Sequence, residues 1–347
     1  MPERRDPASA YRAAGVDLDA ADRFKEKLKR VVGATPQKGV LGELGGFGGC
    51  FSLAGAREAD PVLVASTDGV GTKVLVARAA GRHDTIGHDL VNHCVDDLLA
   101  QGARPLFFLD YIASGRLEED VALALVEGFA RGCRENGIPL LGGETAEMPD
   151  LYEADAYDLA GFIVGVAPRA RLDRLGASVQ AGDLVLGLPS SGLHTNGYTL
   201  ARKVALASGR SISDPVPWGA GSWSDVLLAV HRSYLGAVLP LLDDPALHGC
   251  AHVTGGGFDG NLPRPLRTGL GVRLQRESWE PAPVFEFLAR EGNISSAEMV
   301  RVFNLGIGFC LYVERREADR VAQACSNAGL PAIEIGEVVE GEGVSWE

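Results

Sequence analysis

The chain lacks several features that would direct it to particular functions. Its six cysteines are scattered along 347 residues, and no two have the C-x-x-C spacing of a zinc or redox site. Reduced, mostly buried thiols are therefore expected rather than a disulfide framework. A basic excess is also missing, since 33 Lys and Arg stand against 46 Asp and Glu, for a formal net charge of −13. Because nucleic acids and anionic membranes bind clustered basic residues, neither is expected as a partner.

Targeting signals and familiar nucleotide-binding loops are missing as well. No apolar run approaches the length of a membrane span, and the first 15 residues hold no apolar core of a secretory signal, so we expect a cytoplasmic protein. "STDGVGTK" at 66–73 does not fit a Walker A loop. "GELGGFGG" at 42–49 follows no strand and lacks the spacing of a dinucleotide fingerprint. The chain must bind any nucleotide in another way.

Hydrophobic periodicity predicts helices and strands mixed irregularly in both halves. Helices are expected at 18–32, 83–102, 117–137 and, as one continuous element, 224–243. Strands are expected at 61–67, 105–114 and 157–172. This mixture favours an α/β (α+β) chain with two domains, residues 1–170 and 171–347, rather than one doubly wound sheet.

Several carboxylates are placed where they can converge. Asp68, Asp110 and Glu144 each follow a predicted strand. The helix between the first two carries Asp89, His93, Asp96 and Asp97, of which the first three share a face. Any one of these acids alone is as readily a surface residue or a helix cap. Together they would repel one another unless a hard cation such as Mg²⁺ lay between them.

Glycine-rich and hydroxyl-rich turns suggest contacts with phosphate. Six glycines fall between Gly39 and Gly49, which predicts a mobile loop that becomes ordered on a ligand. "PSSGLHTNG" at 189–197 and "HVTGGGFDGN" at 252–261 each lead into a predicted helix, where backbone N–H groups bind anions. His194 and His252 fit a capping role and a substrate role equally well. Lys73 fits either a phosphate contact or an exposed lysine.

At this point long motifs, in order, resemble one family. "STDGVGTK", "PLFFLDY", "GGETAEMP", "SSGLHTNGY", "TGGGF" and "FNLGIG" are similar to the corresponding segments of phosphoribosylformylglycinamidine cyclo-ligases, from about Tyr11 to the C-terminus. The resemblance implies a cytoplasmic homodimer of purine biosynthesis with no nucleic-acid or membrane partner. It also implies an N-terminal α/β domain whose strands pair into a barrel across the dimer, and a C-terminal α/β domain contributing substrate-binding loops.

The resemblance further implies the reaction and the residues that carry it. ATP would phosphorylate the formyl amide oxygen of formylglycinamidine ribonucleotide, and the amidine nitrogen would then close the imidazole ring. Mg²⁺ would be held by Asp68, Asp97 and Glu144, and Lys73 and His194 would be catalytic. ATP would contact Gly45, Gly46, Phe47, Gly48, Gly49, Thr67, Asp68, Gly69, Thr72, Lys73 and Asp110. The substrate would contact Ser190, Ser191, His194, Asn196, Thr254, Gly255, Gly256 and Gly257.

Other readings share part of this pattern. Asp96 stands where the family pattern has Asn, so its role is open between a ligand and a solvent-facing acid. A selenophosphate synthetase would need a reactive cysteine near the N-terminus, whereas the first cysteine here is Cys50. A formylglycinamidine synthase subunit or a thiamine-phosphate kinase would share the acids but not "GGETAEMPD" beside "PLFFLDY". A nucleotide-sensing module would keep the phosphate loops without turnover.

Overall fold

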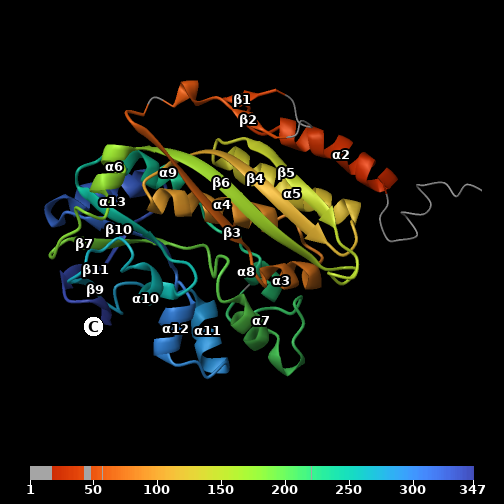
Figure 1. The fold of residues 1–347 in the computed structure, drawn as a ribbon. Helices are drawn as coiled ribbons and strands as arrows, with labels where there is room; N and C mark the ends of the chain where they lie inside the picture. The colour runs from red at the N-terminus through yellow and green to blue at the C-terminus, as the bar shows by residue number, and fades with distance from the viewer. Residues whose placement is uncertain (1–17, 43–47, 57, 220) are drawn as a thin grey trace, which may run out of the picture.

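The computed structural model describes residues 18–42, 48–56, 58–219 and 221–347, and it contains two separate β-sheets (Figure 1). One has four strands in the order β3-β6-β4-β5, and the other has six in the order β12-β9-β11-β7-β10-β8. A short hairpin pairs β1 with β2. The mixed α/β character is thereby confirmed, and neither sheet closes into a barrel within the described chain. No helix in these residues is both long and apolar enough to cross a bilayer.

The four-stranded sheet is built from the first half of the chain. Strand β6 pairs antiparallel with β3 and β4, and β4 pairs parallel with β5. The strands are β3 (Pro61–Gly69), β4 (Arg104–Ser114), β5 (Leu140–Glu147) and β6 (Tyr157–Pro168). The other elements of this half are α2 (Leu18–Gly33), β1 (Val40–Leu41), β2 (Cys50–Phe51), η1 (Leu53–Gly55), α3 (Lys73–Ala80), α4 (Ile86–Ala100) and α5 (Glu119–Glu135).

Helices α4 and α5 cover one face of this sheet and form its core. Each helix brings a glycine to their crossing, where a Cβ on Gly87 would meet Leu125 O at 2.2 Å and one on Gly128 would meet Asp84 O at 2.6 Å. The backbones can therefore approach closely, and Phe108 of β4 packs under them against Phe129. The ends of α5 follow from its sequence, since acids lie in the first turn and Arg134 in the last.

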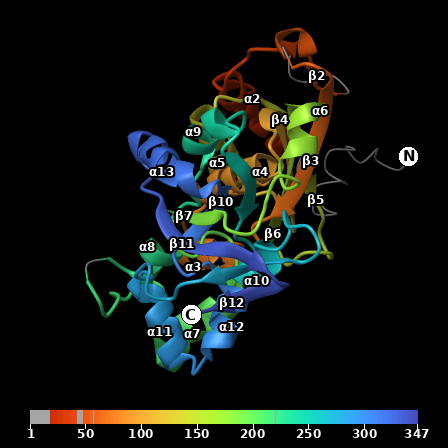
Figure 2. The ribbon, with the colours of Figure 1, turned by 90° about the vertical axis from the view of Figure 1, so that its left-hand side faces the viewer.

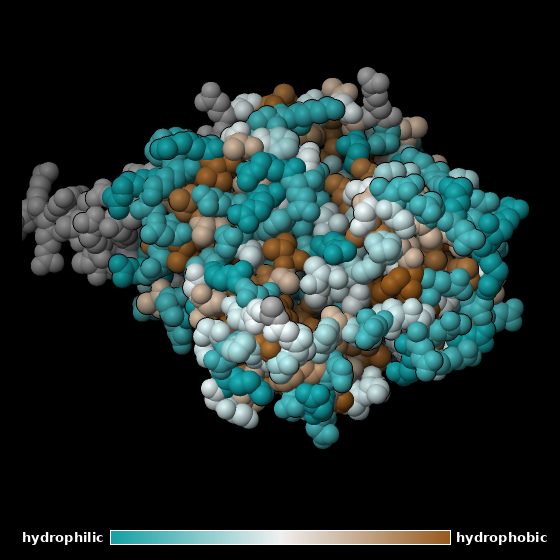
Figure 3. Space-filling model, turned by 180° about the vertical axis from the view of Figure 1, so that it is seen from behind, coloured by the Kyte–Doolittle hydropathy of each residue, from teal (hydrophilic) through white to brown (hydrophobic). Residues whose placement is uncertain are grey.

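The opposite face of the four-stranded sheet carries no helix of the described chain. Figure 1 views this face from the front, with α4 and α5 behind it, and Figure 2 shows the sheet nearly edge-on. Its side chains are largely apolar, and Leu63 and Phe162 are 58% and 43% exposed. On the opposite side of the molecule, Figure 3 shows mainly hydrophilic side chains. Exposed apolar patches of this kind are typical of interaction surfaces.

The second half forms the six-stranded sheet with helices around it. Its strands are β7 (Leu184–Pro189), β8 (Leu247–His252), β9 (Leu270–Leu274), β10 (Ile307–Val313), β11 (Ile333–Glu340) and β12 (Gly343–Trp346). Its longer helices are α6 (Arg169–Arg174), α7 (Tyr198–Ala205), α11 (Pro283–Glu291), α12 (Ser296–Val302) and α13 (Ala318–Asn327). The shorter ones are η2 (Ala207–Gly209), α8 (Trp223–Leu227), α9 (Leu235–Val238), η3 (Leu239–Leu241), α10 (Gly257–Asn261) and η4 (Arg315–Glu317). The expected boundary at 170/171 lies between the two sheets and stays a prediction.

The continuous helix expected at 224–243 is wrong. The chain forms α8, leaves helical conformation over 229–234, and resumes with α9 and η3. Side chains of α4 bind the backbone of this intervening segment: Asp89 accepts from the His231 amide at 2.7 Å, and Asp96 accepts from the Tyr234 amide at 2.9 Å. These tertiary hydrogen bonds replace the helical ones, which hydrophobic periodicity alone does not reveal.

Candidate functional site

The stretch 66–73 lies where β3 ends and α3 begins, at the junction of the two halves. Its side chains reach into different elements. Ser66 Oγ donates to Asp97 Oδ2 at 3.0 Å, and Thr72 Oγ1 lies 3.0 Å from Thr199 Oγ1 of α7. The residues crowded at this turn thus connect β3, α4 and the second half of the chain.

Lys73 does not occupy the phosphate-facing position expected for it. Its side chain is fully buried, and Nζ donates to Asp89 Oδ1 at 2.8 Å, to His194 O at 2.9 Å and to Ala229 O at 2.8 Å. Burial raises the pKa of the Asp89 carboxyl and lowers the pKa of the Lys73 ammonium, and the ion pair opposes both shifts. With all three protons donated, this ammonium joins the two halves of the chain.

Asp68 and Asp97, two of the three acids predicted to hold Mg²⁺, both lie beside His93. His93 Nε2 lies 2.7 Å from Asp68 Oδ2 and 3.8 Å from Asp97 Oδ2, between the two carboxylates. Burial raises the pKa of the Asp68 carboxyl, but the hydrogen bond and charge of His93 lower it by more. The resulting pKa is below its ordinary value. Asp97 follows the same pattern, with His252 providing the largest opposing contribution. Both side chains are therefore carboxylates at neutral pH, and both remain partly exposed.

Glu144 lies apart from this pair in the same chain. One row of paired residues crosses the sheet through Asp68, Gly161, Asp110 and Gly143. Paired residues point to the same face of a sheet, so Asp68 and Asp110 are on one face. Glu144, the next residue, points to the other face. It is also on β5, separated from β3 by two strands, or about 14 Å. The three acids expected to hold Mg²⁺ therefore do not converge within one chain.

Asp110 lies on the helix-covered face of the sheet and is almost fully buried. The expected ATP contact is therefore not exposed on this chain. Burial raises the pKa of the Asp110 carboxyl to about 7, and the charge of Glu144 adds to this effect. A Cβ at the paired position, Gly143, would lie 2.1 Å from Asp110 Oδ1, so only glycine leaves room for this carboxyl.

The glycine-rich loop approaches the β5 edge of the sheet rather than the Asp68 edge. Gly45, Gly46 and Phe47 lie outside the described residues. Gly48 and Gly49 line a hollow of about 350 Å³ together with Leu140 and Leu141 of β5. The residues expected to contact ATP or Mg²⁺ thus include two groups at opposite edges of the sheet: Asp68 and Asp97 beside β3, and Gly48, Gly49 and Glu144 at β5. Thr67 lies on the open face of β3, at the same edge as Asp68, and Gly69 is the last residue of β3.

The two expected substrate loops lie next to each other. A Cβ on Gly255 would be 3.3 Å from Asn196 Oδ1, and a hollow of about 500 Å³ adjoins Asn196 and Thr72.

Hydrogen bonds within the chain hold both loops. Ser190 and Ser191 donate to the backbone carbonyls of Gly192 and Val230. Asn261 Nδ2 donates to the carbonyls of Thr254, Gly255 and Gly257, and so shapes the second loop, in which Gly256 has a φ of +93°. His194, by contrast, is only 1% exposed and is not open to substrate in this structure.

A cleft of about 830 Å³ lies between the two halves. Ser66, Asp97 and His252 line one part of it, and Arg264 and Arg267 line another. Neither arginine was predicted as a site residue, although Arg264 follows the glycine-rich turn at 252–261 by three residues. The cleft therefore joins a carboxylate region to a guanidinium region, which suits a metal-bound polyphosphate together with a phosphorylated substrate.

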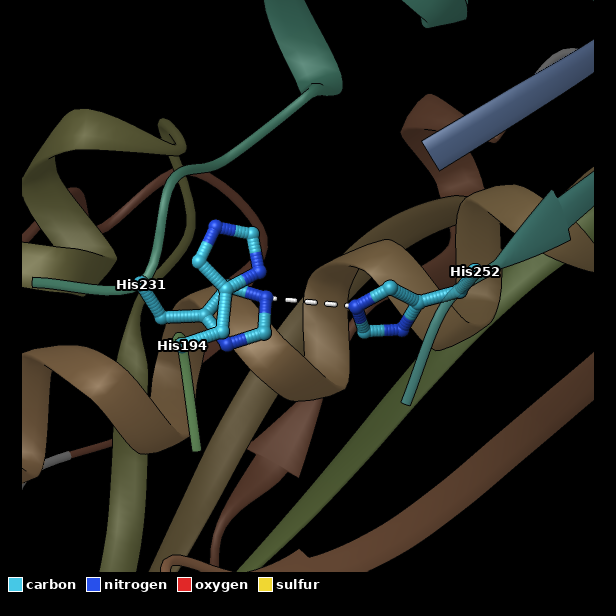
Figure 4. A group of neighbouring side chains, drawn as sticks. All are labelled: His194, His231 and His252. Atoms are coloured by element: carbon cyan, nitrogen blue, oxygen red, sulfur yellow. Dashed lines mark hydrogen bonds between the residues drawn. The ribbon is translucent and has the colours of Figure 1, made fainter. Parts of the chain in front are cut away.

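The grouping of four buried histidines was not predicted from the sequence, although His194 and His252 were predicted individually as site candidates. His93, His194, His231 and His252 come from α4, the loop before α7, the segment 229–234 and the end of β8, and each is at most 5% exposed. The rings of His194 and His231 stack with centroids 3.9 Å apart, facing His252 (Figure 4). Successive histidines of this group are at least 21 positions apart in the chain, so no local sequence motif indicates that they lie together.

Comparison with known proteins identifies the family. Two family profiles match, the AIR synthase related protein N-terminal domain over residues 51–167 and its C-terminal domain over residues 180–347. The chain is 48% identical to the phosphoribosylformylglycinamidine cyclo-ligase of Myxococcus xanthus (strain DK1622), covering 96% of this chain and 97% of that protein. The chain belongs to the phosphoribosylformylglycinamidine cyclo-ligase family. The enzyme of that name from Geobacillus thermodenitrificans (strain NG80-2) is also 48% identical, over 97% of both chains.

Solved structures show that the chain shares its fold with proteins outside the family. A thiamine-monophosphate kinase from Stenotrophomonas maltophilia K279a superposes with a TM-score of 0.67, covering 94% of this chain and 95% of that one, at 18% identity. That likeness shows the fold alone. The much higher identity to cyclo-ligases over nearly the full chain places it in that family rather than among the selenophosphate synthetases, formylglycinamidine synthase subunits or thiamine-phosphate kinases.

Proposed function

We propose that the chain catalyses the ATP-dependent ring closure of formylglycinamidine ribonucleotide to 5-aminoimidazole ribonucleotide in the cytoplasm, as a step of purine biosynthesis. The observation that carries this proposal is the 48% identity to cyclo-ligases over nearly the whole length of both chains. The formyl amide oxygen attacks the γ-phosphorus of ATP and ADP leaves. The amidine nitrogen then attacks the activated carbon, phosphate leaves with the former amide oxygen, and one proton is released.

The residues of the cleft suit the first step. An amide oxygen is a poor leaving group until it is phosphorylated, and phosphoryl transfer depends mainly on positioning and charge neutralisation. Asp68 and Asp97 offer two ionised carboxylates at the cleft, the donor set that Mg²⁺ takes alongside phosphate oxygens. Bound there, Mg²⁺ would neutralise charge on the transferred phosphoryl group. Asp97 is held in place by Ser66 and His252 through both of its oxygens.

The guanidinium region suits the other reactant. Arg264 and Arg267 are exposed and line the same cleft as Asp97, so they can bind the 5′-phosphate of the ribonucleotide. The loops around Asn196 and Gly255 are the remaining substrate contacts in this proposal. The side chains of Lys73 and His194 are buried beneath the cleft surface. We therefore assign them a positioning role rather than contact with the reacting atoms.

We further propose that the complete ATP site needs two chains. Glu144 and the glycines at β5 lie about 14 Å from Asp68 within one chain. The open apolar face of the four-stranded sheet and its free edge strands favour pairing with a second copy. Two four-stranded sheets, one from each chain, would then close into the barrel that the family resemblance implies. In that homodimer, Glu144 and Gly48–Gly49 of one subunit would complete the site formed by Asp68 and Asp97 of the other.

Turnover is the direct test of the main proposal. Incubation with formylglycinamidine ribonucleotide, ATP and Mg²⁺ should release ADP and the aminoimidazole product in equal amounts. Asp97→Asn should abolish product formation, whereas Glu127→Gln, which changes an exposed acid of α5, should not. ATP binding without any product would instead identify a nucleotide-sensing module and overturn the proposed activity.

Complementation between inactive subunits tests the composite site. Asp97→Asn and Glu144→Gln should each be inactive alone, because each removes one carboxylate from every site. After the two variants are unfolded and refolded together, half of the dimers are mixed and each holds one intact site, so about a quarter of the native activity should return. If the mixture stays inactive while mixed dimers are demonstrably present, the two acids belong to the same subunit's site.

A further inference from the structure

His194, His231 and His252 form a compact group in the interior of the molecule. One ring nitrogen from each lies within 4.8 Å of the other two. The three imidazoles come from three separate segments and converge on one place, as Figure 4 shows. Each histidine is at most 5% exposed, so the group has little contact with bulk water.

The hydrogen bonds of His252 leave a nitrogen lone pair directed into this group. His252 Nδ1 lies 2.9 Å from Asp97 Oδ1, and an ionised carboxylate only accepts, so Nδ1 carries the ring proton. His252 Nε2 then has the free lone pair of the ring, and in the metal-free structure it accepts a hydrogen bond from His231 Nε2 at 3.2 Å. Two nitrogens bound to one tetrahedral zinc-type ion at about 2.0–2.1 Å are roughly 3.3 Å apart, which matches this spacing.

Two buried polar atoms beside these nitrogens have no hydrogen-bond partner among the described residues. One is His194 Nδ1, and the other is Asp96 Oδ2, which lies 3.3 Å from His231 Nε2. Buried polar atoms are rarely left unpaired, because burial removes their hydrogen bonds to water without replacing them. A cation among the three rings would bind the His194 nitrogen and place a positive charge beside the Asp96 carboxylate.

His231 and His194 must each move the ring proton to the other nitrogen to serve as ligands. In His231 the proton that Nε2 donates to His252 moves to Nδ1, which lies 3.4 Å from Thr195 Oγ1. The Ser191 amide donates to His194 Nε2 at 3.2 Å, which puts the proton of the neutral ring on Nδ1. Ligation through Nδ1 moves this proton to Nε2 and replaces that long hydrogen bond with a metal–nitrogen bond. The backbone of His194 is already held by Lys73, which donates to its carbonyl at 2.9 Å.

We propose that His194, His231 and His252, with Asp96 beside them, bind one divalent transition-metal ion of the zinc type. Imidazole nitrogens select zinc, cobalt, nickel or copper ions, whereas Mg²⁺ takes oxygen ligands, so this site is chemically distinct from the proposed magnesium site. Asp97 orients His252 from behind, in the manner of carboxylates that support zinc-binding histidines. The ion links α4, through Asp96, to the segment 229–234 and to β8, and so stabilises the junction of the two halves.

Cobalt substitution tests this site without depending on catalytic activity. The full-length protein, stripped with a chelator, is titrated with Co²⁺ in the presence of excess Mg²⁺, which occupies oxygen-rich sites. We expect one equivalent of Co²⁺ to give the strong visible absorption of a four-coordinate nitrogen-rich site, and Zn²⁺ to displace it. Zn²⁺ but not further Mg²⁺ should raise the melting temperature of the stripped protein.

Variants assign the signal to these histidines. His231→Ala and His194→Gln should each weaken Co²⁺ binding about 100-fold or more, since even the loss of a residue supporting a ligand weakens binding 10- to 100-fold. His88→Gln changes a histidine outside the group and should leave binding unchanged. Weak absorption typical of six-coordinate oxygen ligation, less than about 0.1 equivalent bound, or an unchanged signal in folded His231→Ala protein would each overturn the proposal and leave a purely hydrogen-bonded cluster.

Discussion

At the residue scale, Lys73 and Asp89 show how burial changes the meaning of a charged side chain. Lys73 belongs to a motif rich in phosphate-binding residue types, yet its ammonium is fully buried with one carboxylate and two backbone carbonyls. A buried charge is stable only when such partners surround it. The ion pair therefore makes the position of α3 depend on the segments that contain His194 and Ala229.

Replacement of Lys73 should reveal this structural role. Lys73→Met leaves the Asp89 carboxylate buried without its partner and should lower the free energy of unfolding by about 3–5 kcal/mol, measured by urea denaturation. Lys73→Met combined with Asp89→Leu should recover much of this loss, since no buried charge then remains. Unchanged stability together with a lost affinity for ATP would show instead that Lys73 contacts the phosphates of ATP.

Asp110 provides a pH-dependent prediction. Its pKa in the folded chain is raised to about 7 by burial, so ionisation opposes folding. The penalty is absent below about pH 4, grows as pH rises, and is complete above about pH 7, because the folded chain binds the proton more tightly than the unfolded chain. Asp110→Asn should therefore match the native chain in stability near pH 4 and exceed it at pH 8 by up to about 4 kcal/mol.

Comparison of the two proteins across the pH range isolates this single group, because all other titrating side chains are common to both. The measurement is the difference in free energy of unfolding from denaturant curves at several pH values. A difference that stays constant from pH 4 to pH 8 would show that Asp110 keeps an ordinary pKa.

At the element scale, α4 determines the geometry of the junction. Its buried face holds Asp89, Asn92 and Asp96, which fix the segment 229–234, while Asp97 at its exposed side faces the cleft. The helix lies close to α5 because both carry glycine at the crossing. A displacement of α4 would therefore move the cleft carboxylate and the histidine group together.

Gly87→Ala tests this dependence. The added Cβ would lie 2.2 Å from Leu125 O, so α4 and α5 must move apart, and the variant should be destabilised by about 1–3 kcal/mol with weakened binding of Mg²⁺-ATP. Gly236→Ala is a matched control, since nothing lies within 4 Å of its Cβ position and it also sits in a helix. Thermal unfolding and nucleotide titration report the two effects. Equal behaviour of the two variants would mean that the crossing can relax without moving the site.

At the scale of the whole molecule, the open face of the four-stranded sheet governs assembly. Leu63 and Phe162 project from a face that no described helix covers, and strands β3 and β5 form its edges. In water such a face favours association, because apolar area is buried and free edge strands are protected. A dimer formed there would also bring together the two groups of ATP-binding residues.

Phe162→Glu should prevent this association. The charged side chain would be buried in the interface, so the variant is expected to sediment as a monomer and to lose ring-closing activity, while its far-UV circular dichroism stays native. Leu151→Glu changes a more exposed leucine outside the strands, at 71% exposure, and should leave both assembly and activity intact. An active, dimeric Phe162→Glu protein would place the interface elsewhere.

The sequence by itself determined the elements whose signals are local. The helix expected at 117–137 is α5 (Glu119–Glu135), since its acidic first turn, apolar stripe and terminal glycine all lie within the element. The strands expected at 61–67 and 105–114 are β3 and β4 for the same reason. The family could also be recognised from ordered motifs, because such motifs need no knowledge of how the chain folds.

Tertiary structure alone decided which of these residues meet. The break at 229–234, the burial of Lys73, the separation of Glu144 from Asp68 and the grouping of three histidines all depend on contacts between residues far apart in the chain. Periodicity describes how one segment faces the core, but it carries no information on which distant segment supplies the opposite face. Those contacts are set by the packing of α4 against two sheets, where hydrogen bonds and ion pairs are satisfied across the junction rather than within an element.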